Sequence, residues 1–230
     1  MPKKVKILVA DDEPKILMFV RANLEARGYE VSLAQDGVEA VEIAGRVSPD
    51  VIVLDVNMPR MDGIEACRRI REWGNMPIII LSVREDEKDK VRALDEGADD
   101  YMTKPFGVEE LLARIRVALR HSTGVTSTAP SLEGGGLEID FSHRIVKRYG
   151  EIVKLTKTEY ELLAYLASNS GKVLTHKQIL HSVWGPEYGE ESEYVRVFMR
   201  QLRSKIEDDP SNPRFIITEP RVGYRFVKPE

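Results

Sequence analysis

The stretch VIVLDVNMPRMDG, residues 51–63, brings an apolar run directly up to a carboxylate. Residues 51–54 are all apolar, and Asp55 follows without a break. Such a run predicts a strand buried on both faces, as in a parallel sheet covered by helices. Chemistry in these sheets gathers at the carboxyl ends of the strands. Asp55 is therefore a candidate functional residue.

Apolar runs and helical patterns alternate on both sides of this stretch. Strands are expected at KILVA (6–10), YEVSLA (29–34), DVIVLD (50–55), PIIILS (77–82) and ADDYMTK (98–104). Five strands alternating with five helices predict a parallel sheet with helices on both faces. We therefore expect a doubly wound, five-stranded α/β domain over residues 1–120.

A change of composition separates this half from the rest of the chain. Residues 121–136, HSTGVTSTAPSLEGGG, are mostly small, polar, Gly or Pro, which predicts a flexible linker. Beyond it, residues 137–230 form the second expected domain. Its pattern is short antiparallel strands at 137–155, helices at 156–168, 175–183 and 191–207, and strands at 214–218 and 223–227. Three helices and a terminal hairpin predict an α+β winged helix-turn-helix domain.

The composition limits where the protein works. The net charge of −4 argues against a surface that is basic throughout, although a local basic face remains compatible with it. A single cysteine, Cys67, excludes an internal disulfide and fits a reducing compartment. No apolar stretch approaches about 18 residues, and no signal peptide is evident. We expect a soluble cytoplasmic protein with no membrane partner.

Polar side chains follow four of the five expected strands. Asp11 and Asp12 follow the first strand, Asp55 ends the third, Ser82 the fourth and Lys104 the fifth. Such groups can be solvated caps when taken singly, but at four strand ends they favour a shared site. Carboxylates that converge repel one another and need a cation, and oxygen ligands without nearby His or Cys suit Mg²⁺. A carboxylate beside Mg²⁺ can attack phosphorus and form an aspartyl phosphate.

Four motifs together resemble the receiver domain of two-component response regulators. They are ILVADDEP (7–14), VIVLDVNMPRMDG (51–63), PIIILS (77–82) and GADDYMTKPF (97–106). The resemblance covers about residues 4–120 and implies a flavodoxin-like strand order, with Asp55 as the phosphoacceptor. It also implies Mg²⁺ as cofactor. The implied ligands are Asp12, Asp55, the main-chain carbonyl of Asn57, and Asp11 directly or through water.

The same resemblance implies roles for residues at the ends of the fourth and fifth strands. Lys104 would contact the phosphoryl group, and Ser82 would donate a hydrogen bond to one of its oxygens. Tyr101 would turn inward together with Ser82. The Lys104-Pro105 bond is a candidate cis peptide, because X-Pro bonds are where cis peptides usually occur.

A dimer face is implied by the resemblance to the OmpR/PhoB class of regulators. Members of this class pair through the fourth helix, fifth strand and fifth helix around a two-fold axis. Taken alone, the charges there could equally belong to an ordinary solvated surface. The implied ion pairs are Lys90 with Glu110, Asp100 with Arg114, and Asp99 with Arg120 or the neighbouring position 121.

The helix expected at 191–207 carries one apolar face and one arginine stripe. Arg196, Arg200 and Arg203 recur at i, i+4 and i+7. Arginines on an exposed helix face suit a DNA major groove, where they bind guanine or phosphate. A solvated amphipathic helix is the alternative reading of this segment alone. Gln201 lies within the same helix, and glutamine pairs well with adenine.

The end of the chain supports DNA binding by a further resemblance. RFIITEPRVGYRF (214–226) resembles the wing of the OmpR/PhoB class, and LTKTEYELLAYLASNSGKVLTHKQILHSVWG (155–185) resembles its first helices. Tyr224 belongs to the closing Gly-Tyr-Arg-Phe motif, and we count it among the expected DNA-binding residues. Arg221 would enter a minor groove. The arginine of the class usually stands before a glycine, whereas here Val222 intervenes.

The expected function is that of a DNA-binding response regulator, not a turnover enzyme. REWGNMPIIILS (71–82) and residues 183–219 resemble the Kdp potassium-responsive subgroup, which implies a potassium-transport operon as target. The implied partners are a sensor histidine kinase, promoter DNA, a second copy of the chain and RNA polymerase. One alternative is a haloacid-dehalogenase-like phosphatase, which would need an acid where Asn57 stands. The other is a phosphorelay module that never binds DNA.

Overall fold

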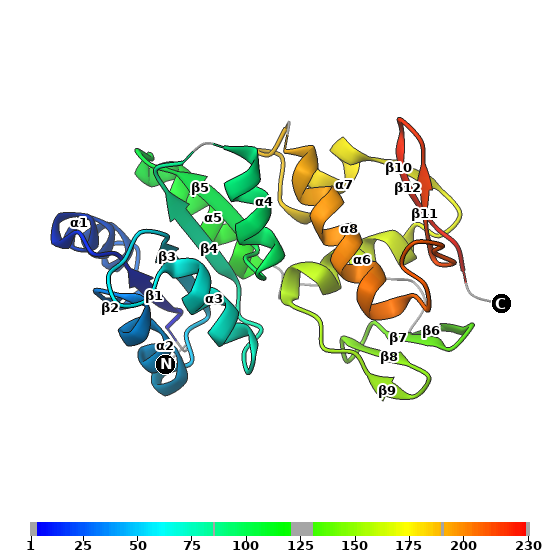
Figure 1. Cartoon of the computed structure of the whole chain (residues 1–230), viewed down its shortest axis with the longest axis horizontal. Coiled ribbons are helices and arrows are strands. Elements are labelled where there is room, and N and C mark those ends of the chain that lie inside the picture. The colour runs from blue at the N-terminus through cyan, green and yellow to red at the C-terminus, as the bar shows by residue number, and fades with distance from the viewer. Residues whose placement is uncertain (1–3, 85, 121–130, 190, 229–230) are drawn as a thin grey trace. The chain divides into compact units, whose positions relative to one another are not determined.

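The computed structural model describes residues 4–84, 86–120, 131–189 and 191–228 (Figure 1). The chain divides into two compact units, residues 1–120 and 121–230. Among the described residues, the first unit contains one sheet and the second contains two, and each unit has its own buried core.

A five-stranded sheet forms the centre of the first unit (Figure 1). Its strands lie in the order β2-β1-β3-β4-β5, and all neighbouring pairs are parallel. This confirms the expected doubly wound sheet. The order reverses between β1 and β3, and ligand sites of such folds occur at this reversal. The strands are β1 (Lys6–Ala10), β2 (Glu30–Ala34), β3 (Val51–Asp55), β4 (Ile78–Ser82) and β5 (Asp100–Thr103).

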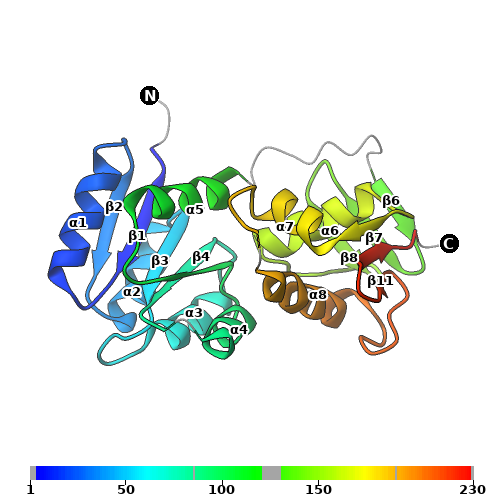
Figure 2. The same cartoon turned by 90° about the horizontal axis from the view of Figure 1, so that it is seen from above.

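Helices cover both faces of this sheet, as Figure 2 shows. Because side chains alternate along a strand, Val51 and Val53 of β3 face a core shared with the helices α1 and α5. The alternate residues, Ile52 and Leu54, point to the opposite face, toward the other three helices. All five residues of β3 are buried, as the unbroken apolar run predicted. The helices are α1 (Pro14–Glu25), α2 (Gly37–Val47), α3 (Gly63–Arg71), α4 (Glu87–Asp95) and α5 (Val108–Arg120).

The loop between β3 and α3 is packed tightly against its surroundings. A Cβ atom on Gly63 would lie 2.0 Å from the main-chain oxygen of Asp55, so only glycine fits there. Asp62 caps α3 by accepting the N–H of Glu65 at 2.7 Å. At the other side of the loop, the Gly37 N–H donates to the Met61 carbonyl at 3.1 Å. These contacts hold the segment that carries Asn57.

The second unit combines two antiparallel sheets with three helices. The four-stranded sheet has the order β6-β7-β8-β9, and the three-stranded sheet has the order β10-β12-β11. This confirms a winged-helix domain, with β10 as an unpredicted third strand of the wing sheet. Its elements are β6 (Ser131–Gly134), β7 (Leu137–Asp140), β8 (Ile145–Arg148), β9 (Glu151–Ile152), α6 (Lys157–Ser168), β10 (Val173–Thr175), α7 (His176–Val183), α8 (Ser192–Ile206), β11 (Ile216–Glu219) and β12 (Gly223–Phe226).

The predicted linker over 121–136 is wrong at its C-terminal end. Strand β6 pairs with β7, from Ser131 opposite Asp140 to Gly134 opposite Leu137. Gly135 and Gly136 form the turn of this hairpin, with φ values of 54° and 81°. Glycine suits such a turn because it adopts positive φ without steric cost. The remaining predicted linker residues, 121–130, lie outside the described residues.

Glu207 connects the end of α8 to the wing sheet. Its buried carboxylate accepts the N–H groups of Arg214 at 2.8 Å, Phe215 at 2.9 Å and Ile216 at 2.8 Å. Hydrogen bonds to a charged acceptor contribute more than neutral ones. We expect Glu207→Ala to lower the free energy of unfolding of this unit by about 2–4 kcal/mol.

Urea denaturation of the full chain, followed through Trp184 fluorescence in a Trp73→Phe background, would measure this loss. Glu207→Gln keeps one acceptor oxygen and should lose less than the alanine variant. Equal midpoints for the wild type and Glu207→Ala would show that these bonds contribute no net stability.

Candidate functional site

The strand-end groups of the first unit converge on Lys104. Its Nζ atom lies 2.7 Å from Asp11 Oδ2 and 2.5 Å from Asp55 Oδ1. The three side chains are buried, with exposed fractions of 9% for Lys104, 0% for Asp11 and 4% for Asp55. Asp12, which follows Asp11 after β1, is exposed. The structure thus brings together two carboxylates and one ammonium at the ends of β1, β3 and β5.

Burial and the neighbouring charges shift the pKa values of Asp55 and Lys104. Burial raises the pKa of the Asp55 carboxyl, and the nearby charge of Asp11 adds to this, while Lys104 and the Asn57 N–H partly oppose it. That N–H donates to Asp55 Oδ2 at 2.7 Å. Burial lowers the pKa of Lys104, but its bonds to the two aspartates outweigh burial, so the net shift is upward. Lys104 therefore remains a cation at neutral pH.

The donor atoms around Asp55 suit a hard cation. The expected ligands, which are the carboxylates of Asp11, Asp12 and Asp55 and the main-chain carbonyl of Asn57, are all oxygen donors. The two buried carboxylates exceed the single ammonium by one negative charge. Within the described ranges, no three or more His, Cys, Asp or Glu side chains are arranged to hold a metal ion. Mg²⁺ fits these residues because it often binds one or two carboxylates and keeps several waters.

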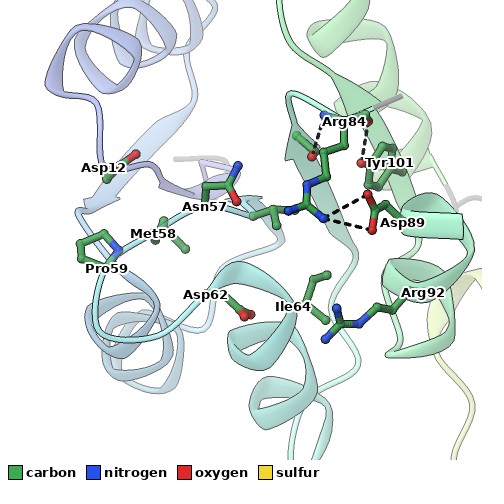
Figure 3. Close-up of a pocket in the computed structure, with 12 residues that line it drawn as sticks. Asp12, Asn57, Met58, Pro59, Asp62, Ile64, Arg84, Asp89, Arg92 and Tyr101 are labelled. Atoms are coloured by element: carbon green, nitrogen blue, oxygen red, sulfur yellow. Dashed lines mark hydrogen bonds and ion pairs between the residues drawn. The ribbon is translucent and has the colours of Figure 1, made fainter. Parts of the chain in front are cut away.

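A cavity of about 500 Å³ opens at this edge of the sheet (Figure 3). Asp12 and Asn57 line one side, and the opposite side is formed by residues of the β4–α4 loop, α4 and β5. Arg84 reaches from that loop toward Asp89 on α4, at 3.2 Å. The cavity could admit a small anionic group beside Asp55. Its full lining is Asp12, Val56, Asn57, Met58, Pro59, Asp62, Ile64, Ser82, Arg84, Asp89, Arg92 and Tyr101.

Ser82 and Tyr101 lie in contact with the same loop. Ser82 Oγ accepts the Arg84 N–H at 3.1 Å, and the Tyr101 hydroxyl donates to the Arg84 carbonyl at 2.8 Å. Both residues are buried, and burial raises the pKa of Tyr101, so its hydroxyl keeps its proton. The Lys104-Pro105 peptide bond is cis, as expected. The main chain of Arg84 thus connects the side chains of Ser82 and Tyr101.

Comparisons with known proteins agree with this geometry. Residues 7–116 match the family described as response regulator receiver domain, and residues 150–226 match the family described as transcriptional regulatory protein, C terminal. The transcriptional regulatory protein KdpE of Mycobacterium tuberculosis is 46% identical over 221 residues, which cover 96% of this chain and 98% of that protein. The KDP operon transcriptional regulatory protein KdpE of Escherichia coli is 45% identical over the same length, with the same coverage.

Solved structures also match nearly the whole chain. A RitR mutant has a TM-score of 0.78 and 32% identity, covering 97% of this chain and 99% of that one. DrrB of Thermotoga maritima, described as an OmpR/PhoB homolog, has a TM-score of 0.50 and 33% identity, covering 98% and 100%. The chain belongs to the OmpR/PhoB-type response regulators. It is a two-component transcriptional regulator with a DNA-binding domain rather than a classical enzyme.

Membership of this family carries general expectations. Receiver domains generally use Mg²⁺ for phosphorylation, and response regulators interact with a histidine kinase and promoter DNA. Across the residues that the structure covers, no helix of the regulator is long and apolar enough to cross a membrane.

Some side chains of the expected dimer face already have partners within the same chain. Arg114 binds Asp100 of its own chain at 2.9 Å and Glu110 at 2.8 Å. Lys90 lies half-buried on α4. Arg120 is the last residue of α5, but its side chain lies outside the described part of the structure. These residues therefore belong to the expected elements, although Arg114 is already paired within one chain.

The expectation that Asp99 contacts a second copy needs correction. Asp99 is 4% exposed, and its Oδ2 atom accepts from the Arg71 guanidinium at 2.6 Å and from the Ile78 N–H at 2.9 Å. Both partners lie in the same unit, so Asp99 closes the turn before β5 instead of facing outward. Sequence spacing could not show this, because Arg71 lies 28 positions earlier in the chain.

The arginine stripe of α8 divides into two groups. Arg196 and Arg200 are exposed on the helix, whereas Arg203 bonds to the wing strand β11. Gln201 is half-buried, and Arg221 is exposed in the turn between β11 and β12, with φ 64°. Arg196, Arg200 and Arg221 are therefore the exposed arginines among the expected DNA-binding residues.

Tyr224, also expected at the DNA, is largely buried. It is 7% exposed, and its ring packs edge-on against His176, with centroids 5.4 Å apart. The structure therefore places most of this side chain inside the domain.

Sequence reasoning missed two arginines at this end of the receiver. Arg84 lines the cavity, and Arg60 binds the buried carboxylate of Asp36 at the start of α2. The position of Arg84, two residues after Ser82, was the available signal. Nothing comparable marked Arg60, whose partner lies 24 positions away and becomes adjacent only in the fold.

Proposed function

We propose that the regulator receives its signal as a phosphoryl group on Asp55, donated by a sensor histidine kinase. The observation that carries this proposal is Lys104 Nζ lying between Asp11 and Asp55, at the strand ends of a receiver domain. Asp55 directly precedes Val56 and Asn57, which line the neighbouring cavity, whereas Asp11 is fully buried. Asp55 is therefore the carboxylate that a phosphodonor reaches.

Phosphoryl transfer would use the side chains already assembled there. An Asp55 carboxylate oxygen attacks phosphorus, and the bond between phosphorus and the kinase histidine nitrogen breaks, with the electron pair leaving on that nitrogen. Lys104 and the Ser82 hydroxyl then bind phosphoryl oxygens. Asp11, Asp12, Asp55 and the Asn57 carbonyl would hold Mg²⁺, which offsets negative charge on the phosphoryl group. Attack by water later restores Asp55 and releases phosphate.

Phosphorylation would be followed by pairing of two receivers through α4, β5 and α5. The pairs Lys90 with Glu110 and Asp100 with Arg114 would form across a two-fold axis. Arg114 would exchange the Asp100 of its own chain for that of its partner, so the number of ion pairs is conserved. Asp99 is left out of these pairs, because its carboxylate is held by Arg71 of its own chain.

The proposal also names the promoter that the regulator binds. Relatives that match nearly the whole chain are KdpE regulators, and one is named for the KDP operon. We infer that this regulator acts in the cytoplasm on a potassium-transport operon of the same kind, downstream of a Kdp-type sensor kinase. Arg196 and Arg200 would enter a major groove, with Gln201 at its edge and Arg221 near a minor groove. Contact with RNA polymerase beside the promoter is part of the same proposal.

DNA binding measured by gel shift tests the target. We expect the phosphorylated chain to bind the promoter of the potassium-transport operon in its own genome at least about tenfold more tightly than an unrelated promoter of equal length. Affinity should fall steeply between 50 and 200 mM salt, since arginine–phosphate contacts release counterions.

Each alternative outcome has a distinct meaning. Equal affinity for both promoters would overturn the operon assignment and leave DNA binding intact. No salt-dependent binding to either DNA would favour a phosphorelay module. Steady turnover of an organic phosphate ester by the purified chain would favour a phosphatase instead.

A further inference from the structure

Arg203 is joined to the wing by three hydrogen bonds. Its Nε and Nη2 atoms donate to the Ile216 carbonyl at 3.1 and 2.6 Å, and Nη2 also donates to Thr218 Oγ1 at 2.8 Å. The guanidinium carbon lies 5.6 Å from the centre of the Tyr224 ring. Thr218 and Tyr224 are paired neighbours on β11 and β12. One arginine of α8 thus contacts both strands of the hairpin.

Side chains at the end of α8 bind the main-chain polar groups of Ile216 at the edge of the wing sheet. Strand β11 lies at the edge of its sheet, because its one neighbour in that sheet is β12. The Ile216 N–H donates to Glu207, and the Ile216 carbonyl accepts from Arg203. Positions 203 and 207 are one helical turn apart, so they lie on the same side of the helix end. Both main-chain polar groups of this edge residue are therefore bound by side chains at the end of α8.

We propose that Arg203 is a positioning residue, which sets the place of the wing relative to α8 and acts on DNA through Arg221. Arg221 lies three residues beyond Thr218, at the exposed tip of the hairpin that Arg203 holds. A guanidinium has a rigid fork of donors, which can bind Ile216 and Thr218 together. A lysine in its place would keep the charge but lose this fork. Arg196, exposed on the same helix, lacks such a tie to the wing among the described contacts.

A double-mutant cycle with Arg221 tests this role. The full-length chain would be titrated onto the duplex that the wild type enriches most strongly from a random library, with fluorescence anisotropy as the readout. Arg203→Lys and Arg203→Met should each weaken binding about tenfold, the effect of losing one good DNA contact. In the Arg221→Ala background, the same substitutions should weaken binding less than about twofold, because the wing tip no longer makes its contact.

Arg196 provides the matched control on the same helix. Arg196→Met should weaken binding, Arg196→Lys should retain most of it, and both effects should be unchanged by Arg221→Ala. Thr218→Val, which removes one acceptor of Arg203 and leaves the carbonyl, should show a smaller effect with the same dependence on Arg221. Circular dichroism at the assay temperature confirms that each variant is folded.

Three results would overturn the proposal. The first is wild-type affinity for Arg203→Lys, because charge alone would then suffice. The second is a full, additive loss for Arg203→Met in the Arg221→Ala background, which would make Arg203 a direct DNA contact. The third is equally strong coupling of Arg196 to Arg221, which would mean that the coupling does not pass through the bonds to Ile216 and Thr218.

Discussion

Replacing Asp55 by alanine is expected to abolish phosphoryl labelling of the regulator by acetyl phosphate in the presence of Mg²⁺. The wild type should take up one phosphoryl group, because Asp55 contacts Lys104 and directly precedes Val56 and Asn57, which line the cavity. Asp11 cannot substitute for it, since that side chain is fully buried. Mass spectrometry of the intact chain measures the result, and borohydride reduction, which converts the aspartyl phosphate to acid-stable homoserine with release of phosphate, maps the labelled residue.

Asp62 offers the matched control for this experiment. It lines the same cavity, but it caps α3 through the Glu65 N–H, at 2.7 Å. Asp62→Ala should lose about 1 kcal/mol of stability, as other capping residues do, and should still be labelled at Asp55. Labelling of Asp55→Ala at the wild-type level would show that the phosphoacceptor lies elsewhere.

Replacing Lys104 by methionine should have the largest effect on the stability of the receiver. The substitution leaves the buried carboxylates of Asp11 and Asp55 facing each other without their ammonium partner. Removing one partner from a buried ion pair typically costs several kcal/mol, because the remaining charge is left uncompensated. We expect a loss of about 3 kcal/mol in the free energy of unfolding at pH 8, measured in EDTA.

The pH dependence of this loss has a definite sign. The pKa of Asp55 is raised in the folded wild type, and without Lys104 it should rise further. A group with a raised folded-state pKa favours the folded state below its unfolded pKa, and this contribution is lost as pH rises through the folded pKa. The deficit of Lys104→Met should therefore be greatest at alkaline pH and shrink toward pH 4. Saturating Mg²⁺ should reduce it as well, by restoring a cation beside the carboxylates.

Urea denaturation at several pH values measures these differences. In a Trp184→Phe background, Trp73 is the remaining tryptophan, so its fluorescence reports on the receiver alone. Lys15→Met, which removes an exposed lysine of α1, serves as the control and should stay within about 0.5 kcal/mol of the wild type. A deficit for Lys104→Met that is the same at pH 4 and pH 8 would contradict an electrostatic origin.

Local patterns in the sequence predicted the elements and the position of the site. The apolar run at 51–54 indicated a buried strand, and β3 is buried along its whole length. Alternation of strands and helices indicated a parallel sheet, whose strand ends must lie along one edge. The convergence of Asp11, Asp55 and Lys104 follows from that geometry. Asp62 and Gly63, which close the quoted stretch, form the start of α3.

The errors arose where a residue's role depends on a distant partner. The glycines at 134–136 resembled linker composition, but Gly134 ends β6 and the other two form the turn to a strand that begins at Leu137. Asp99 resembled an interface residue in the sequence, but in the fold it is paired with Arg71. Helical spacing correctly grouped Arg203 with Arg196 and Arg200, since spacing reports direction along one helix. It carries no information on the wing strand that lies against that side of the helix.

The two domains, the parallel sheet, the winged-helix class and the set of groups at the strand ends all follow from patterns in the sequence. Periodicity and strand-end chemistry are local properties, so they are visible in the amino-acid order alone. Which charges are paired within the chain depends on the folded arrangement. It showed Lys104 shared by Asp11 and Asp55, Asp99 held by Arg71, and Arg203 bonded to β11. These pairings join residues far apart in sequence, and their geometry exists only once the chain has folded.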